Sequence, residues 1–234
     1  MASEPNKQGT ESNLVIVGAG GHGSELLAYL EGMPTNGMRL LGFIDAKKPQ
    51  GPWLRSRILG GLDELTSLAE NTRSNALNYI TAFGDNAIRW RVVRAIEKMD
   101  LTIIRPWTLW HPSSQVGSEV EIGNGTLLAP NTIVTTRARI GRHCILNVRV
   151  SVSHDVSIGD FVNVNPAAVI CGCVEIGDGS YIGAGAVVKD RVRIGRGVTV
   201  GAGAVVIRDL PDGVTAVGVP ARVIKENSID WLNA

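Results

Sequence analysis

Residues 170–206 read ICGCVE-IGDGSY-IGAGAV-VKDRVR-IGRGVT-VGAGAV-V, which is six hexapeptides that each begin with Ile or Val. The same six-residue step, taken from Val116 to Val206, meets an aliphatic residue sixteen times without an insertion. An α-helix repeats every 3.6 residues and a strand every two, so neither element explains this period. A coil of short strands with one corner per hexapeptide explains it, because the aliphatic side chain then points inward at every step.

Glycine follows the aliphatic residue at eight of the sixteen positions, and we expect these small residues to permit the corner between strands. The Ile-Gly pair recurs every eighteen residues from Ile122 to Ile194, so three hexapeptides make one coil. Sixteen hexapeptides give about five coils, and strands of successive coils should stack at the usual strand spacing. Residues eighteen apart are therefore predicted to be neighbours.

Composition divides the chain into two parts. Of eleven aromatic residues in 234, nine lie outside residues 112–230, whereas the 28 glycines favour a repeat. Basic and acidic residues nearly cancel (23 and 22), which argues against nucleic-acid binding. No apolar run is long enough to span a membrane, and the polar residues 1–12 are expected to be a disordered tail.

Three cysteines, Cys144, Cys171 and Cys173, are an odd count in a chain that is large enough to fold without disulfides. A C-x-C without a second pair is a weak zinc signal, so no metal is expected. These features favour a reduced, soluble, cytoplasmic protein.

The first half shows alternating β and α patterns, which predict a small parallel sheet covered by helices. We expect strands at 14–17, 40–44, 77–82 and 101–104, and helices at 24–32, 62–70 and 84–99. Gly18-x-Gly20-x-x-Gly23 lies between the first strand and helix, and Asp45 follows the second strand. Such a loop lets backbone N–H groups approach a diphosphate, and the carboxylate can accept from ribose hydroxyls.

This motif is also compatible with an NAD-dependent oxidoreductase or with a glycine turn that only packs strand on helix. About ninety residues are available, half of a full dinucleotide-binding fold, so a nucleotide-linked sugar suits the module better. His22 inside the loop argues against a mere packing turn.

The combination of Gly18–Gly23, Gly84–Arg89, His111–Ser113, the repeat and the closing segment 216–222 resembles bacterial nucleotide-amino-sugar N-acetyltransferases and their sialic-acid O-acetyltransferase relatives. The resemblance covers residues 14–224. It implies a left-handed parallel β-helix, a homotrimer, and acetyl-CoA bound in the groove between prisms. The expected domains are the tail at 1–12, a nucleotide-sugar-binding α/β module at 13–106, and the β-helix acyltransferase domain at 107–234.

Acetyl transfer needs a base near the attacking group and a donor for the oxyanion. Among the four histidines, His154 lies two residues after an inward valine, and the stacking rule places Thr136 below it and Gly172 above it. Asp155 should stack over Arg137, which would keep it ionised beside the imidazole. His143 is expected to lie on a solvated face.

The resemblance implies the same base, with Asp155 as its partner and the Gly172 N–H toward the thioester carbonyl. The resemblance also implies a nucleotide-sugar site and an acetyl-CoA site. The first comprises Gly20, Gly21, His22, Asp45, Ala46, Gly84 and Asn147; the second comprises Asn163, Gly172, Gly183, Ala184 and Ala202. Asn163 stands where relatives commonly carry a second histidine, and it can donate a hydrogen bond but cannot carry a proton.

Three other functions remain as alternatives. A histidine base serves an amine or a hydroxyl equally, so O-acetylation of a sugar such as a sialic acid stays open. A γ-class carbonic anhydrase would need three histidine ligands, but His143 and His154 are eleven apart with no histidine downstream. A non-catalytic hexapeptide scaffold would need neither the His-Asp pair nor the glycine loop. The nucleotide base, the sugar and the position of its amine are not determined by these residues.

Overall fold

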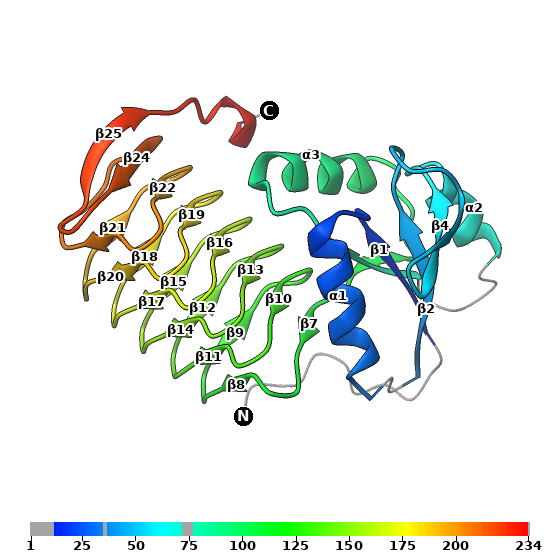
Figure 1. Cartoon of the computed structure of the whole chain (residues 1–234), viewed down its shortest axis with the longest axis horizontal. Helices are drawn as coiled ribbons and strands as arrows, with labels where there is room; N and C mark the ends of the chain where they lie inside the picture. Colours follow the sequence, from blue (N-terminus) through cyan, green and yellow to red (C-terminus); the bar gives the residue numbers. More distant parts are fainter. Residues whose placement is uncertain (1–11, 35–36, 72–76, 234) are drawn as a thin grey trace. The chain divides into compact units, whose positions relative to one another are not determined.

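The computed structural model describes residues 12–34, 37–71 and 77–233. Residues 1–11 of the tail expected at 1–12 lie outside them, and Ser12 is the first residue of a strand rather than part of a tail. The described chain divides between Trp107 and Thr108 into two compact units. The first unit is an α/β module, and the second is a stack of β coils (Figure 1).

The α/β module is built on a six-stranded sheet in the order β3-β4-β2-β1-β5-β6. Its strands are β1 (Ser12–Val17), β2 (Met38–Ile44), β3 (Gly51–Trp53), β4 (Ser56–Gly60), β5 (Leu77–Thr81) and β6 (Ile104–Pro106), and its helices are α1 (Gly21–Glu31), α2 (Glu64–Asn71) and α3 (Asn86–Glu97). All pairings are parallel except that of β3 with β4. Residues 14–17 of β1 are fully buried at the centre of the sheet.

Three features of this module differ from those predicted from the sequence. The β3–β4 hairpin was not expected, because residues 47–57 lack an alternating apolar pattern. The last strand is Ile104–Pro106 rather than 101–104, and the proline is tolerated because β6 is an edge strand. The first helix begins at Gly21 instead of Ser24, so the second half of the glycine motif belongs to the helix.

The second unit is a three-sided β-helix whose coils contribute one strand to each of three sheets. The first sheet contains β7 (Leu109–Trp110), β10 (Leu127–Leu128), β13 (Ile145–Leu146), β16 (Asn163–Val164), β19 (Tyr181–Ile182), β22 (Thr199–Val200), β24 (Val214–Val217) and the antiparallel β25 (Arg222–Glu226). The second sheet contains β8 (Gln115–Val116), β11 (Ile133–Val134), β14 (Ser151–Val152), β17 (Val169–Ile170), β20 (Val187–Val188) and β23 (Val205–Val206). The third contains β9 (Glu121–Ile122), β12 (Arg139–Ile140), β15 (Ser157–Ile158), β18 (Glu175–Ile176) and β21 (Arg193–Ile194), and a 3₁₀ helix (Asp230–Leu232) follows β25.

The predicted repeat is confirmed by the pairing register. Val152, for example, pairs with Val134 below it and Ile170 above it, each eighteen residues away. The aliphatic residues of the six-residue series pack inward into one continuous core. The expected fold class, an α/β module followed by a parallel β-helix, is confirmed.

The glycines of the repeat have a different role from the one expected. The left-handed backbone conformation falls on every sixth residue from Glu119 to Gly203, with φ between 51° and 77°, and most of these corner residues are not glycine. Glycine is needed one residue after the aliphatic position for another reason. A Cβ at Gly141, for instance, would lie 2.4 Å from the Gly159 carbonyl oxygen of the next coil. The small residue permits close stacking of coils rather than the turn itself.

Candidate functional site

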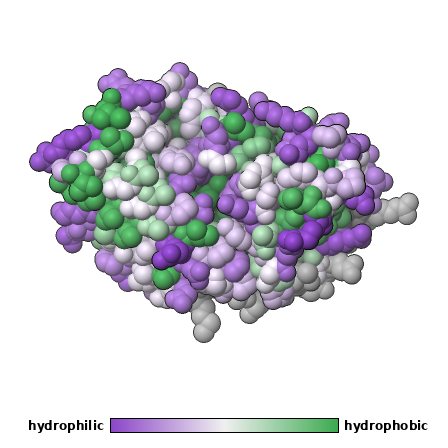
Figure 2. Space-filling view, viewed as in Figure 1, coloured by the Kyte–Doolittle hydropathy of each residue, from purple (hydrophilic) through white to green (hydrophobic). Residues whose placement is uncertain are grey.

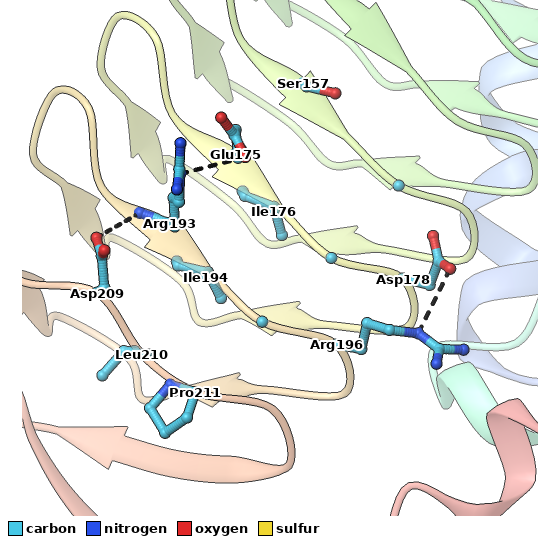
Figure 3. Close-up of a pocket in the computed structure, with 13 residues that line it drawn as sticks. Ser157, Glu175, Ile176, Asp178, Arg193, Ile194, Arg196, Asp209, Leu210 and Pro211 are labelled. Atoms are coloured by element: carbon cyan, nitrogen blue, oxygen red, sulfur yellow. Dashed lines mark hydrogen bonds and ion pairs between the residues drawn. The ribbon is translucent and has the colours of Figure 1, made fainter.

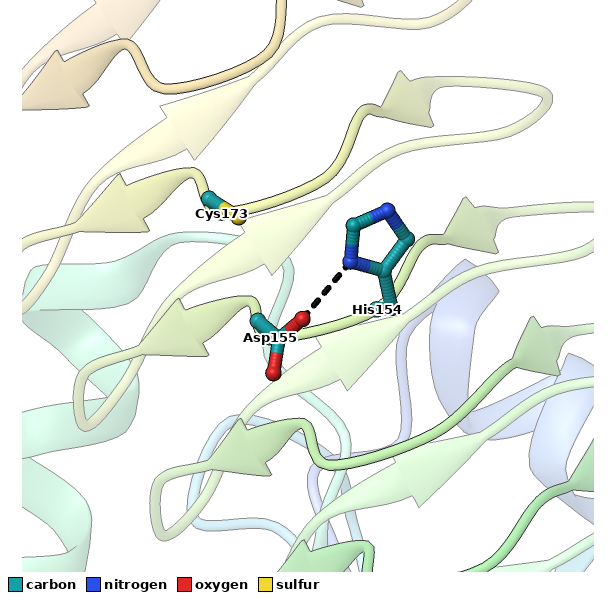
Figure 4. Close-up of side chains that lie close together, drawn as sticks. All are labelled: His154, Asp155 and Cys173. Atoms are coloured by element: carbon teal, nitrogen blue, oxygen red, sulfur yellow. Dashed lines mark hydrogen bonds and ion pairs between the residues drawn. The ribbon is translucent and has the colours of Figure 1, made fainter.

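His154 and Asp155 lie at the corner that follows β14, where the chain leaves the second sheet. Nδ1 of His154 is 2.7 Å from Oδ2 of Asp155, and the dashed line in Figure 4 marks this contact. Asp155 also accepts two hydrogen bonds from Arg137 of the preceding coil, at 2.8 Å from Nε and 2.9 Å from Nη2. The three side chains therefore form a continuous series from guanidinium to carboxylate to imidazole, as the stacking rule predicts for Arg137 and Asp155.

The electrostatics of this series keep Asp155 charged beside the imidazole. The hydrogen bonds from Arg137 hold the pKa of Asp155 well below its usual range, and the hydrogen bond with His154 acts in the same direction. Asp155 is therefore ionised at neutral pH. An ionised carboxylate at Nδ1 favours the tautomer that carries its proton there, which leaves the lone pair of Nε2 available to accept a proton.

Gly172 lies one coil above His154, and the imidazole occupies the space that a side chain would take. A Cβ at Gly172 would be 2.6 Å from Nε2 and 2.7 Å from Cε1 of His154. The backbone N–H groups on either side of Gly172 donate hydrogen bonds to neighbouring coils: that of Cys171 to the Val188 carbonyl, and that of Cys173 to the His154 carbonyl. Within the described part of the chain, the Gly172 N–H makes no such hydrogen bond, so it can serve as a donor to a bound group.

A small pocket of about 250 Å³ opens beside the imidazole, lined by His154, Gly172, Cys173, Asp190 and Arg191. The last three residues were not among the predicted site residues. The same eighteen-residue step would have found them, because Cys173 and Arg191 continue the column of Arg137 and Asp155, and Asp190 follows Gly172. The pocket thus combines a base, a backbone donor and a thiol.

A larger groove of about 680 Å³ lies over the third sheet (Figure 3). Four of its charged side chains form two pairs: Glu175 lies 3.5 Å from Arg193, and Asp178 lies 3.7 Å from Arg196. A fifth, Asp209, accepts a hydrogen bond from the Arg193 backbone N–H. The residues that line it include no histidine or cysteine. The larger groove therefore offers carboxylates but neither an imidazole nor a thiol, whereas the smaller pocket has both.

The predicted acetyl-CoA residues divide between two places. Gly183, Ala184 and Ala202 share the corner that follows the first sheet, where Ala184 and Ala202 are exposed and stack one coil apart. At Gly183 a Cβ would come within 2.5 Å of the Ala202 amide nitrogen, so this glycine also has a packing role. Asn163 is buried on the first sheet, only 3% exposed, and it is not among the residues lining the His154 pocket.

The predicted nucleotide residues meet at one edge of the α/β sheet. Gly20 and Gly21 follow β1, Asp45 and Ala46 follow β2, and Gly84 follows β5, so they lie at the carboxyl ends of three adjacent strands. The strand order places this edge at a topological switch point, where α/β proteins bind ligands. A Cβ at Gly20, Gly21 or Gly84 would meet no atom within 4 Å. Glycine at these positions is therefore not demanded by packing, and it leaves open space at the N-terminus of α1.

Asp45 and His22 have definite partners in this loop. The carboxylate of Asp45 accepts from the backbone N–H groups of Ala19 and Lys47, each at 2.8 Å, and so fixes the loop. Nδ1 of His22 is 3.0 Å from Glu25, while its buried Nε2 has no hydrogen-bond partner among the described residues. Asn147, which was grouped with these residues, lies in the β-helix, where its Oδ1 accepts from the Val148 N–H at 2.7 Å.

The expectation for His143 is wrong. His143 occupies a left-handed corner, but it is only 2% exposed and stacks on Phe161 of the next coil, with ring centroids 5.2 Å apart. A histidine at this corner position is covered when the coil above supplies an aromatic ring. His143 is therefore part of the core and not of a solvated face.

Comparison with known proteins agrees with both halves of the fold. The family model for the PglD N-terminal domain matches residues 13–96. The family model for the bacterial transferase hexapeptide repeat matches residues 155–190 and 173–208. A solved structure of a perosamine N-acetyltransferase mutant from Caulobacter crescentus, in complex with CoA and GDP-perosamine, is 30% identical with a TM-score of 0.82. The match covers 92% of this chain and 98% of that chain. This chain belongs to the same family of hexapeptide-repeat acetyltransferases.

Two further relatives of this acetyltransferase are similar over nearly their whole length. The acetyltransferase domain of PglB from Neisseria gonorrhoeae is 31% identical, with a TM-score of 0.76, and the match covers 91% of this chain and 99% of that one. WeeI from Acinetobacter baumannii is 30% identical, with a TM-score of 0.77, and the match covers 91% and 100%. A search of curated proteins returned no match. Across the described residues of the acetyltransferase, no helix has the length and apolarity to cross a bilayer.

Proposed function

We propose that this acetyltransferase moves the acetyl group of acetyl-CoA to the amino group of a nucleotide-linked amino-deoxy sugar, such as a 4-amino sugar. The observation that carries the proposal is the Arg137–Asp155–His154 series beneath Gly172, which supplies a base and an oxyanion donor in one pocket. The relative from Caulobacter crescentus, solved with CoA and GDP-perosamine, supports this substrate class.

In the proposed reaction, Nε2 of His154 accepts the proton that the sugar amine loses as its nitrogen attacks the thioester carbon. Asp155 keeps the resulting imidazolium in place and stabilises its charge. The Gly172 N–H donates to the carbonyl oxygen as it becomes negative. The carbon–sulfur bond then breaks, and the CoA thiolate leaves with the proton that His154 held.

The α/β module is proposed to hold the nucleotide diphosphate, as domain 13–106. Gly20 and Gly21 present backbone N–H groups at the N-terminus of α1, where the helix dipole favours a negative group. Asp45 fixes this loop through Ala19 and retains lone pairs for a ribose hydroxyl. Gly84 leaves the opposite side of the site open.

A homotrimer is proposed from the outer face of the second sheet. The outward positions of this sheet include Ile133, Val169, Val187 and Val205, and Ile133 and Val169 are 41% and 36% exposed. The equivalent positions of the third sheet are mostly charged, so the second sheet presents a more apolar outer face than the third. Burying it against further copies of the chain would remove it from water.

The corners on the two sides of the second sheet differ in a way that suits such a trimer. The chain enters this sheet through the corner with Ala184 and Ala202, and leaves it through the corner with His154. Around a threefold axis, the His154 corner of one copy would meet the Ala184 corner of the next. The base would then lie beside a groove of small side chains, which is wide enough for the arm of CoA.

We further propose a cytoplasmic reaction. Its support is that Cys144, Cys171 and Cys173 are all free thiols, which is typical of a reducing compartment.

The test is CoA release from acetyl-CoA in the presence of GDP-, UDP- and dTDP-linked amino sugars and of free sialic acid. We expect turnover with one amino sugar, and His154→Ala should lower kcat roughly 10²- to 10⁴-fold. The matched control is His111→Ala, since His111 lies outside the pocket beside Ser113. Turnover with sialic acid alone would replace N-acetylation by O-acetylation. A folded trimer that releases no CoA with any acceptor of the panel would overturn the proposal.

A further inference from the structure

Cys173 lies beside the proposed base, although nothing in the acetyl-transfer mechanism uses a thiol. One ligand atom each from His154, Asp155 and Cys173 lies within 4.8 Å of the other two (Figure 4). The C-x-C sequence gives a weak zinc signal because it offers no second pair nearby in the chain. The coil supplies the missing donors from the previous turn, eighteen and nineteen residues earlier.

The backbone fixes this arrangement. Asp155 and Cys173 occupy equivalent corners of successive coils and have φ values of 58° and 59°, so their side chains leave the backbone in the same direction. The Cys173 N–H donates to the His154 carbonyl at 3.0 Å, and the Asp155 N–H donates to the Thr136 carbonyl at 3.1 Å. The two corners are therefore held one coil apart, and the imidazole fills the space beneath Gly172 beside the thiol.

We propose that His154, Asp155 and Cys173 form a site for Zn²⁺ that, when filled, blocks the active site. An imidazole, a carboxylate and a thiolate are the three ligand types that Zn²⁺ takes in proteins. Three protein ligands leave a fourth position for water, and the pocket of about 250 Å³ next to these residues provides room for it. Small rotations of exposed side chains bring the three donors to coordination distance, since His154 is 55% exposed and Asp155 38% exposed at the side chain.

The consequence for catalysis rests on the proposed function of His154. A neutral imidazole has a single basic lone pair, so a metal ion on either ring nitrogen leaves no lone pair for the substrate proton. Cys173 binds as the thiolate, and its proton is released to solvent. Removal of the metal by a chelator returns the base, so the inhibition is reversible.

Arg137 limits the affinity of the site. Its guanidinium holds Asp155 from the coil below, whereas Cys173 lies on the coil above, so the metal ion would share the carboxylate with a fixed positive charge. This arrangement favours an inhibitory site that exchanges its metal over a structural site that keeps it. Replacing Arg137 with Gln is expected to tighten metal binding.

The first test measures binding without turnover, so its outcome is independent of the acetyltransferase proposal. The metal-free full-length chain is titrated with Co²⁺ while the near-ultraviolet thiolate-to-metal absorption is recorded, and with Zn²⁺ against a chromophoric chelator. We expect one metal ion per chain. Cys173→Ser should lose the absorption band and bind Zn²⁺ at least roughly 10-fold more weakly. Cys171→Ser, two residues away, is the matched control and should bind as the wild type does.

The second test measures acetyl transfer with added Zn²⁺, each variant being compared with its own metal-free rate. Inhibition of the wild type and of Cys171→Ser should be reversed by EDTA, and Cys173→Ser should need at least roughly 10-fold more Zn²⁺. Equal Co²⁺ spectra and equal Zn²⁺ affinities for wild type and Cys173→Ser would overturn the proposed site. Metal binding through Cys173 without any inhibition would overturn its blocking role while leaving acetyl transfer intact.

Discussion

Arg137 and Asp155 form a two-point ion pair between equivalent corners of successive coils, and both residues have a left-handed backbone, with φ of 51° and 58°. Backbone geometry therefore points both side chains the same way, and the stacking of coils brings them together. The pair is exposed, so its contribution to folding is small. Its main effect is on the charge and position of Asp155 next to the imidazole.

The first prediction concerns the titration of Asp155. Since Arg137 holds the pKa of Asp155 below its usual range, the stabilisation from this pair is complete at neutral pH and is lost only as the pH falls through that depressed value. In Arg137→Gln the pKa of Asp155 should rise toward the ordinary value. A carboxyl-carbon NMR titration measures it, and identical titrations of the two proteins would contradict the assignment.

The second prediction concerns the space above the imidazole. Gly172→Ala should move the His154 ring, because the new Cβ would lie 2.6 Å from Nε2, and kcat should fall at least roughly 10²-fold. The fold should persist, since the obstructing atoms belong to a side chain that can rotate. Cys171→Ala at the same corner is the control, and its kcat should stay within a few-fold of wild type. Equal kcat values for Gly172→Ala and wild type would show that catalysis does not depend on the position of the His154 ring.

The third prediction concerns the nucleotide loop. Gly20 has an extended backbone that any residue adopts and open space where a side chain would go. Gly20→Leu should therefore fold normally but fill the site, raising KM for the nucleotide sugar at least roughly 10-fold with KM for acetyl-CoA unchanged. Gly32→Leu, at the other end of the same helix, is the control. A rise in both KM values would place acetyl-CoA at this loop as well.

The fourth prediction concerns close stacking of coils. Gly141→Ala should destabilise the protein by about 1–3 kcal/mol, because its Cβ would lie 2.4 Å from a backbone oxygen that cannot rotate away. Gly185→Ala is the comparison, since a Cβ there meets no atom within 4 Å and the variant carries only the strain of a left-handed backbone (φ 65°), which Ala167 already tolerates at an equivalent corner. Thermal unfolding of the two variants measures the difference. Equal thermal unfolding midpoints for the two variants would show that the coils move apart to accommodate the added Cβ of Gly141→Ala without extra cost.

The fifth prediction concerns assembly. Val169→Lys places a charge in the apolar outer face of the second sheet and should shift the protein from the proposed trimer to a monomer. Ser157→Lys makes the same change on the third sheet and should leave the trimer intact. Sedimentation or light scattering reports the mass of each. A trimeric Val169→Lys would move the interface to another face.

The β-helix could be predicted closely from the sequence because its rule is periodic. The step of eighteen residues correctly placed Arg137 under Asp155 and Gly172 over His154, without any knowledge of coordinates. The same step places Cys173 over Asp155, but the C-x-C motif alone does not reveal this, because the partners of Cys173 come from the previous coil. His143 was assigned wrongly, since its burial depends on Phe161 above it and not on its own place in the hexapeptide.

The α/β module could be predicted less closely. Its central strands are apolar and local patterns identified them, but the β3–β4 hairpin has no such pattern. The start of α1 at Gly21 also could not be predicted from helix propensity, which glycine lowers. The function of the glycines at Gly20 and Gly84 depends on the open space beside them, which only coordinates reveal.

Because the coil is uninterrupted, the chain returns to the same side of the prism after every eighteen residues. Removing eighteen residues ahead of His154 would shorten the prism by one layer and return every later side chain to its former side. Removing six residues between Arg137 and His154 would rotate everything downstream by one face, so that the imidazole and Asp155 would follow the first sheet instead of the second and lose Arg137. Insertions and deletions between Arg137 and His154 should therefore come in whole turns, or Asp155 loses its guanidinium partner even where the core remains intact.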